Sequence, residues 1–276
     1  MKRALAISCL LMAGCGSPDG TTPSLDSPDD GGGSGGIIES GGAGSDGSPD
    51  GLAGSGGSPQ SGTNPLGRER CQAPPGMGSP GTIEQAVALL NALPKPTSVA
   101  CFVESLDRPL TAAATYSINS AQPAFSIASP RVFLRIGQLW LSIVIAGESS
   151  ELLEFGYLLA EQEEYPRSIK GELRFPLPYE ISASAPYDKV KYMSGTICHL
   201  CHFDERSEKV PGIDNAFSSV AFRPRAETYV SIDSLRYGAQ TCDWKVEPAR
   251  CELLSAVFDG GEVREEAFPA EMPTFF

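Results

Sequence analysis

The first hydrophobic pattern along the chain is helical. In the stretch TIEQAVALLNAL, which begins at Thr82, the residues Ile83, Val87 and Leu90 share one helical face. Thr82 and Gln85 have the spacing of a capping box, in which each side chain satisfies a backbone N–H at the helix start. The prolines of the following PKP end the pattern. We therefore predict one short helix here.

The pattern then changes to that of short strands. Six runs are rich in β-branched and aromatic residues: SVACFVE, TYSI, RVFLRI, LWLSIVI, LLEFGYLL and IKGELRF. Gly137-Gln138 separates the third run from the fourth and has the length and glycine position of a type II′ hairpin turn. In the last run, apolar residues alternate with Lys170, Glu172 and Arg174, as in a strand with one face in water. The fold is therefore predicted to be mainly β, with a β-sandwich or jelly-roll-like domain and a few short helices.

We assign residues 68–190 to this β-rich domain, together with its opening helix, and residues 191–276 to a small C-terminal segment. The sequence becomes irregular after Tyr192. The stretch EPARCELLSAVFDGG then predicts a helix, because Pro248 suits the first turn and the two glycines suit the end.

The N-terminal residues have the pattern of an export signal. Lys2 and Arg3 precede the apolar run ALAISCLLMA, which is too short to cross a bilayer as a helix. The run ends in LMAGC, which resembles the lipobox of bacterial lipoproteins. This resemblance implies that residues 1–15 are a lipoprotein signal and that Cys15 is lipidated. It also implies a lipid-anchored protein of the cell envelope, and Gly16 favours the outer membrane.

Residues 16–67 are of low complexity, dominated by Gly, Ser, Pro and Asp. Such a segment has too little apolar area to offset the entropy of ordering, so we predict a disordered tether. It also carries seven of the acidic residues behind the formal charge of −13. The remainder is mildly acidic and has no basic cluster, which argues against nucleic-acid binding.

Six cysteines follow the tether, and an even number in an exported chain favours disulfides. Two of the six, Cys198 and Cys201, belong to the motif discussed next. The other four are candidates for two disulfides: Cys71, Cys101, Cys242 and Cys251. They can pair as Cys71–Cys101 and Cys242–Cys251, and the sequence alone also permits the two other pairings.

The stretch CHLCH contains both histidines of the chain, His199 and His202. Cys198-x-x-Cys201-His202 has the spacing of a covalent haem site, in which two thiols form thioethers with the haem vinyl groups and the histidine ligates the iron. From Ser194 onward the chain resembles the c-type cytochromes. That resemblance implies one haem c, electron transfer rather than enzymatic catalysis, and a redox protein as partner.

The resemblance also suggests a second iron ligand. Single-haem members of the family commonly supply a downstream methionine, often followed by proline, and Met272-Pro273 lies 70 residues after His202. A thioether ligand raises the reduction potential relative to a second nitrogen ligand. Met272 is therefore the candidate sixth ligand.

Three other interpretations of CHLCH remain open. Zinc binding would need these cysteines with a histidine and either Cys242 or Asp204. A thioredoxin-type dithiol would place His199 between two reactive thiols, although the sequence lacks the βαβ rhythm of that fold. A structural disulfide would make the protein a stapled β-sandwich lipoprotein that binds a partner or glycan and has no cofactor.

Overall fold

The computed structural model describes most of the chain after the tether; the ranges are 67–117, 120, 122–159 and 164–274. The expected signal, the lipidation cysteine Cys15 and nearly all of the expected tether lie outside the described residues. No helix within them is long and apolar enough to cross a membrane.

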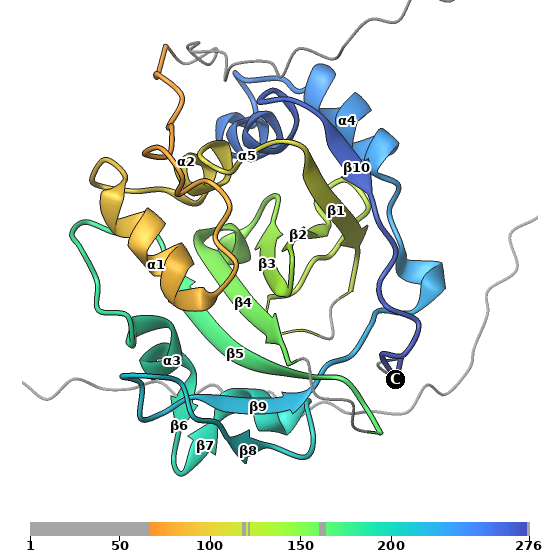
Figure 1. Ribbon diagram of the computed structural model, residues 1–276. Helices are drawn as coiled ribbons and strands as arrows, with labels where there is room; N and C mark the ends of the chain where they lie inside the picture. Colours follow the sequence, from red (N-terminus) through yellow and green to blue (C-terminus); the bar gives the residue numbers. More distant parts are fainter. Residues whose placement is uncertain (1–66, 118–119, 121, 160–163, 275–276) are drawn as a thin grey trace, which may run out of the picture. The chain divides into compact units, whose positions relative to one another are not determined.

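The described residues form a sheet-rich fold with a large mixed sheet (Figure 1). Eight strands pair in the order β10-β1-β2-β3-β4-β5-β9-β8, antiparallel except for β1 with β10. Their bounds are β1 Leu110–Thr115, β2 Arg131–Ile136, β3 Leu139–Val144, β4 Leu152–Leu158, β5 Arg167–Arg174, β8 Arg206–Ser207, β9 Phe217–Val220 and β10 Val263–Glu265. A separate hairpin pairs β6 Lys191–Tyr192 with β7 Gly195–Thr196.

Short helices accompany the sheet. They are α1 Ile83–Ala92, α2 Val99–Glu104, α3 Ala185–Val190, α4 Ile232–Gln240, α5 Pro248–Phe258 and the 3₁₀ helices η1 Glu148–Glu151, η2 Ile197–Leu200 and η3 Ala226–Thr228. The prediction of a mainly β fold with a few short helices is confirmed. The sandwich or jelly-roll arrangement is not confirmed, because the large strands belong to one sheet.

Several local predictions are confirmed. Helix α1 begins after Thr82, whose Oγ1 accepts a hydrogen bond of 3.2 Å from the backbone N–H of Gln85. Helix α5 begins at Pro248, as its proline predicts. Gly137 has a φ of 61° in the two-residue turn between β2 and β3, a conformation that glycine adopts without strain.

Two strand predictions are wrong. SVACFVE forms helix α2, because the Ser98 side chain caps it by accepting a 3.1 Å bond from Cys101 N and because five successive residues, 99–103, are buried. Burial on all sides hides the helical period, so the composition alone suggested a strand. Of the run TYSI only Thr115 belongs to a strand, β1, which spans Leu110–Thr115. The three alanines of β1 hid this strand from a search for β-branched and aromatic residues.

Both disulfides expected from the first pairing are present. Cys71 bonds to Cys101 and so ties the N-terminal segment to α2. Cys242 bonds to Cys251 and so ties the segment after α4 to α5. Cys198 and Cys201 are the two free cysteines of the described chain.

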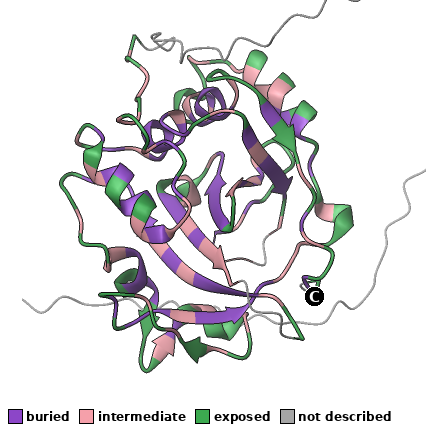
Figure 2. Cartoon of the chain, in the orientation of Figure 1, coloured by how far each residue is buried: buried purple, intermediate pink, exposed green. Residues whose placement is uncertain are grey.

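One face of the large sheet forms the main hydrophobic core. Alternate strand residues such as Leu134, Leu141, Leu153 and Ile169 are buried there with residues of α1, α2 and α5 (Figure 2). These positions are the apolar half of the alternating strand pattern. They account for the stability of the fold but lie opposite the candidate site.

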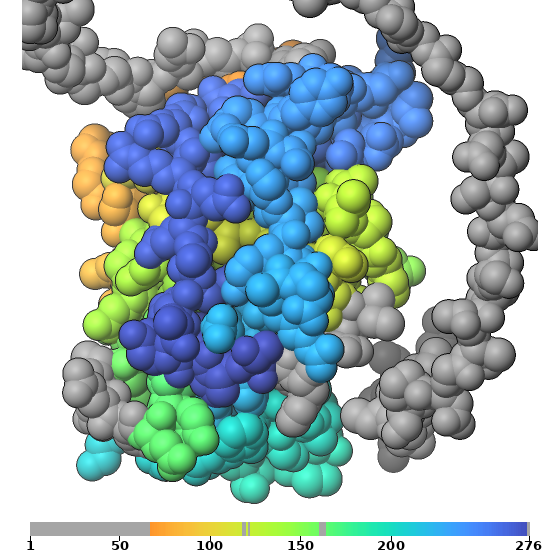
Figure 3. Space-filling view, turned by 90° about the vertical axis from the view of Figure 1, so that its right-hand side faces the viewer, coloured from red at the N-terminus to blue at the C-terminus, as the bar shows by residue number. Residues whose placement is uncertain are grey.

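The other sheet face is polar and is covered by the C-terminal part of the chain. Lys170 and Glu172 lie on this face and line a cavity, whereas Arg174 is exposed. The polar half of this strand is therefore in water at Arg174, while Lys170 and Glu172 are half-buried. Figure 3 shows the C-terminal segments side by side on the surface, and a bridge pairs Arg223 with Thr274.

The segment expected at 191–276 contributes to the large sheet. It supplies β8 and β9 beyond β5 and also β10 beside β1, so its residues extend the sheet at both edges. This topology places the CHLCH motif next to β5 and the end of the chain next to the middle strands.

Candidate functional site

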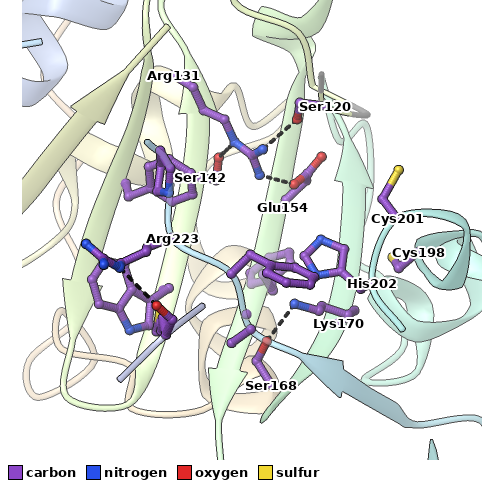
Figure 4. Close-up of a pocket in the computed structure, with 18 of the residues that line it drawn as sticks. Ser120, Arg131, Ser142, Glu154, Ser168, Lys170, Cys198, Cys201, His202 and Arg223 are labelled. Atoms are coloured by element: carbon purple, nitrogen blue, oxygen red, sulfur yellow. Dashed lines mark hydrogen bonds and ion pairs between the residues drawn. The ribbon is translucent and has the colours of Figure 1, made fainter. Parts of the chain in front are cut away.

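A cavity of about 250 Å³ lies between the polar sheet face and the C-terminal segments (Figure 4). From the sheet it is lined by residues that include Arg131, Trp140, Ser142, Glu154, Gly156 and Lys170. From the C-terminal part it is lined by residues that include Cys198, Cys201, His202, Arg223, Phe268 and Met272. The structure thus brings together all four residues that the sequence suggested for a haem site.

The loop that carries the motif is fixed by Glu205. Its carboxylate accepts a 2.9 Å hydrogen bond from the backbone N–H of Thr196 and a second bond from the Thr196 hydroxyl. Thr196 in turn caps η2, because its Oγ1 accepts a 3.2 Å bond from Cys198 N. A Cβ at position 195 would overlap the Glu205 carboxylate, so Gly195 is required for this contact.

His202 is held as a neutral imidazole. Its Nδ1 lies 2.8 Å from the carbonyl oxygen of Val220, and a carbonyl only accepts hydrogen bonds, so Nδ1 carries the proton and Nε2 the lone pair. Burial is the main cause that lowers the pKa of His202 to about 3, and the charges of Lys170 and Arg131 contribute to this value. A neutral imidazole oriented in this way is suited to ligate a metal ion and is not protonated at neutral pH.

The two thiols differ in their surroundings. Cys198 is half-buried, and burial raises the pKa of its thiol against the opposing effects of Lys170 and a Thr196 hydrogen bond. Cys201 is exposed at the outer edge of the cavity. The backbone N–H groups of Cys201 and His202 both donate to the Cys198 carbonyl oxygen, at 3.1 and 2.8 Å. This turn keeps the three residues together at one side of the cavity.

His199 lies outside this arrangement. It is exposed, does not line the cavity, and its Nδ1 lies 2.5 Å from the Thr196 carbonyl oxygen. Its ring stacks on Tyr192 with centroids 6.4 Å apart. The two histidines of the motif therefore have separate roles, and only His202 faces the cavity.

Met272 is buried and also lines the cavity. It packs in a small cluster with Ala113, Trp140, Ala221 and Phe268. In the same cluster the Trp140 and Phe268 rings are stacked with centroids 5.2 Å apart. Met272 therefore belongs to the Trp140 side of the cavity.

A glycine lies between the two sides. Strand register aligns Trp140 of β3, Gly156 of β4 and Lys170 of β5 in one row across the sheet. His202 lies beside Lys170 (Figure 4), and Met272 packs near Trp140. A Cβ at Gly156 would only reach ordinary contact distances of 3.9 Å, so the missing side chain leaves a gap in the cavity floor. The two outer strands are about 9–10 Å apart, from two inter-strand spacings.

Charged groups surround this gap. Arg131 donates to Glu154 and to Ser120, the latter at 2.5 Å (Figure 4). Lys170 donates a 2.6 Å bond to Ser168, and burial lowers the pKa of its ammonium to about 8. Burial raises the pKa of the Glu172 carboxyl.

Two buried polar atoms of the lining have no hydrogen-bond partner in the described part of the chain. They are Nε1 of Trp140, a donor, and Oε1 of Glu154, an acceptor. A buried polar atom without a partner costs about 1–3 kcal/mol, which a bound molecule can recover. A molecule bound in the cavity could supply a partner to both atoms.

The structure contradicts the zinc interpretation within the described residues. No group of three or more His, Cys, Asp or Glu side chains is placed to hold a metal ion there. Cys242 is in a disulfide, and Asp204 accepts a 2.6 Å bond from Arg167 and another from Arg206.

Sequence reasoning found the motif and Met272 but missed the sheet residues of the cavity. The available signal was the polar half of the strand alternation: Lys170, Glu154 and Ser142 occupy positions that a solvent-facing strand would also make polar. Only the covering C-terminal segments distinguish a lined cavity from a wet surface.

We compared the chain with protein-family models, curated proteins and solved structures. None of the three comparisons gives a match. The functional interpretation therefore rests on the geometry and chemistry of the cavity.

Proposed function

We propose that the protein binds one covalent c-type haem in this cavity and transfers electrons. Cys198 and Cys201 would form the thioethers, His202 would ligate the iron through Nε2, and Met272 would be the second axial ligand. The observation that carries the proposal is that the three motif residues and Met272, 70 positions further along the chain, line one cavity.

The residues fit such a group in three respects. His202 is neutral, with its Nδ1 proton directed to the Val220 carbonyl. The adjacent thiols are not in a disulfide. The floor opens at Gly156 between the side that carries His202 and the side that carries Met272.

The size of the cavity agrees with covalent attachment. About 250 Å³ lies slightly below the range of about 300–1,000 Å³ that is usual for small-molecule sites. Thioethers hold a haem without full enclosure, so the cavity needs to contain only part of the ring, with an edge at the exposed Cys201. That edge would give electrons a short path to a redox partner.

When bound, the haem supplies a one-electron couple between ferric and ferrous iron. The chain sets the conditions for that couple. His202 keeps its lone pair at neutral pH, the aromatic cluster around Phe268 excludes water, and a Met272 thioether favours the ferrous state. We further propose that an N-terminal lipid at Cys15 anchors the protein in the cell envelope, where haem attachment after export takes place.

The test is to export the protein with a cytochrome maturation system after replacing the signal cysteine. We expect a Soret band and haem-dependent peroxidase staining that survives denaturing electrophoresis. His202→Ala should weaken or abolish the spectrum, whereas His199→Ala should leave it unchanged. A colourless wild-type product with all six cysteines oxidised would contradict the proposal and favour the stapled, cofactor-free protein.

A further inference from the structure

Arg223 connects the cavity to the segment that carries Met272. Its Nε donates a 2.9 Å hydrogen bond to the Met272 carbonyl oxygen, and its backbone N–H donates a 3.0 Å bond to the Pro273 carbonyl. A parallel bridge pairs Arg223 with Thr274. One side-chain and one backbone hydrogen bond from Arg223 therefore hold the segment of Met272 against the cavity, which Arg223 also lines.

The Arg223 guanidinium has donors that the described residues do not use. Its Nη atoms form no ion pair or hydrogen bond with the described residues, although Arg131, on the same lining, is paired with Glu154. On the Met272 side, the Nε1 donor of Trp140, which is 8 % exposed, also lacks an acceptor in the described chain. Both residues line the cavity.

The charge balance of the lining also favours an anion. Arg131, Lys170 and Arg223 contribute three cationic groups, against Glu154 and Glu172. Buried charges are normally paired, so the excess positive charge favours a ligand that brings carboxylates.

We infer that Arg223, with Trp140 Nε1, binds a carboxylate of the ligand, and that this bond positions Met272. The inference rests on the proposed function, since a haem carries two propionate carboxylates. An arginine fork matches a carboxylate geometrically, whereas a lysine does not. Arg223 can bind the propionate through Nη while its Nε keeps the Met272 carbonyl in place. Haem binding and placement of the sixth ligand are then one event.

Three variants of the full, exported holoprotein test this. Arg223→Gln removes the charge and the fork. Arg223→Lys keeps the charge but lacks a second donor for the Met272 carbonyl. Arg225→Gln is the matched control, because Arg225 is exposed, two residues away, and pairs only weakly with Glu227 at 3.8 Å.

We expect Arg223→Gln to retain covalent haem, as judged by staining, but to lose the weak sulfur–iron absorption band and to have a lower reduction potential. Loss of the thioether and loss of a nearby cation both favour the ferric state. Arg223→Lys should weaken the band while its potential stays closer to wild type. Trp140→Phe should lower the potential less, since it removes one neutral donor.

The outcomes separate the inference from the proposal beneath it. Wild-type protein without haem would contradict the proposed function. Wild-type protein with haem but no sulfur–iron band would overturn the inference, because Met272 would then not be a ligand to position. An Arg223→Gln spectrum and potential equal to those of Arg225→Gln would also overturn it and leave the haem proposal intact.

Discussion

The Nδ1 atom of His202 lies 2.8 Å from the carbonyl oxygen of Val220. Strand β9 ends at Val220, so a strand of the large sheet determines the tautomer of the motif histidine. Such a contact fixes the ring orientation and makes Nε2 the basic nitrogen. The sheet and the motif therefore form one site, although only the motif is recognisable in the sequence.

This histidine predicts a pH dependence of stability in protein produced without haem. The pKa of His202 is about 3 in the folded chain and has its ordinary value of 6.5 in the unfolded chain. Between these values only the unfolded chain binds the proton, so the free energy of unfolding falls as the pH decreases from 6.5 towards 3. The slope from this group is at most about 1.4 kcal/mol per pH unit.

Urea unfolding across that range measures the effect. Since carboxylates also titrate there, the comparison is with variants: His202→Gln should flatten the dependence, and His199→Gln should not. Equal slopes for wild type and His202→Gln would show that His202 titrates normally.

Side chains introduced at Gly156 should reduce haem incorporation while the protein still folds. Gly156→Ala should leave the free energy of unfolding unchanged or raise it by up to about 1 kcal/mol, because glycine within a strand costs conformational entropy. Gly156→Leu should fold but incorporate much less haem. The ratio of haem absorbance to protein concentration measures this.

Gly171 provides the matched control: its backbone borders the same cavity, but a Cβ there would point to the core-facing side of the sheet. A Cβ there would approach Pro186 Cβ to 3.0 Å. Gly171→Ala should therefore cost about 1–3 kcal/mol of stability by overpacking, while the folded fraction keeps its haem. Full haem incorporation by Gly156→Leu would mean that the gap is not part of the site.

The carboxylate of Glu205 should stabilise the motif loop. Glu205→Ala leaves the buried N–H and hydroxyl of Thr196 without their acceptor, and we expect a loss of about 1.5–3 kcal/mol. Gly195→Ala should have a similar effect, because its Cβ would displace the same carboxylate. Chemical denaturation of both variants measures the loss; wild-type stability in both would show that the loop is held by other contacts.

The two disulfides should contribute unequally to stability. They span sequence separations of 30 and 9 residues, and the chain-entropy relation gives about 3.5 kcal/mol for Cys71–Cys101 and about 2.5 kcal/mol for Cys242–Cys251. Paired Cys→Ser variants, unfolded in urea, test the order. A larger loss for Cys242–Cys251 would indicate that its local contacts, rather than loop closure, dominate.

The sequence was sufficient where local signals agree with tertiary structure. Capping residues located α1, a proline located α5, and a glycine-first turn joined β2 to β3. It was insufficient for α2, where burial on every side removed the helical period and left a composition typical of strands.

The residues of the candidate site also fall into two groups, those that the sequence identifies and those that only the structure brings together. Cys198, Cys201 and His202 form a local motif with its own spacing, so the sequence alone could identify them. Arg131, Glu154 and Lys170 come from three strands and meet only through sheet register. Their polar character is ordinary for an exposed strand face, and what makes them functional candidates is the C-terminal cover, which no local pattern encodes.

The most direct measurement is the intact mass of the exported protein under denaturing, non-reducing conditions. We predict the mass of the chain with two disulfides plus one haem. Cys198→Ser combined with Cys201→Ser should show no added haem. A wild-type mass without haem, and two hydrogens lighter than the chain with two disulfides, would show a third disulfide between Cys198 and Cys201 and would contradict the account.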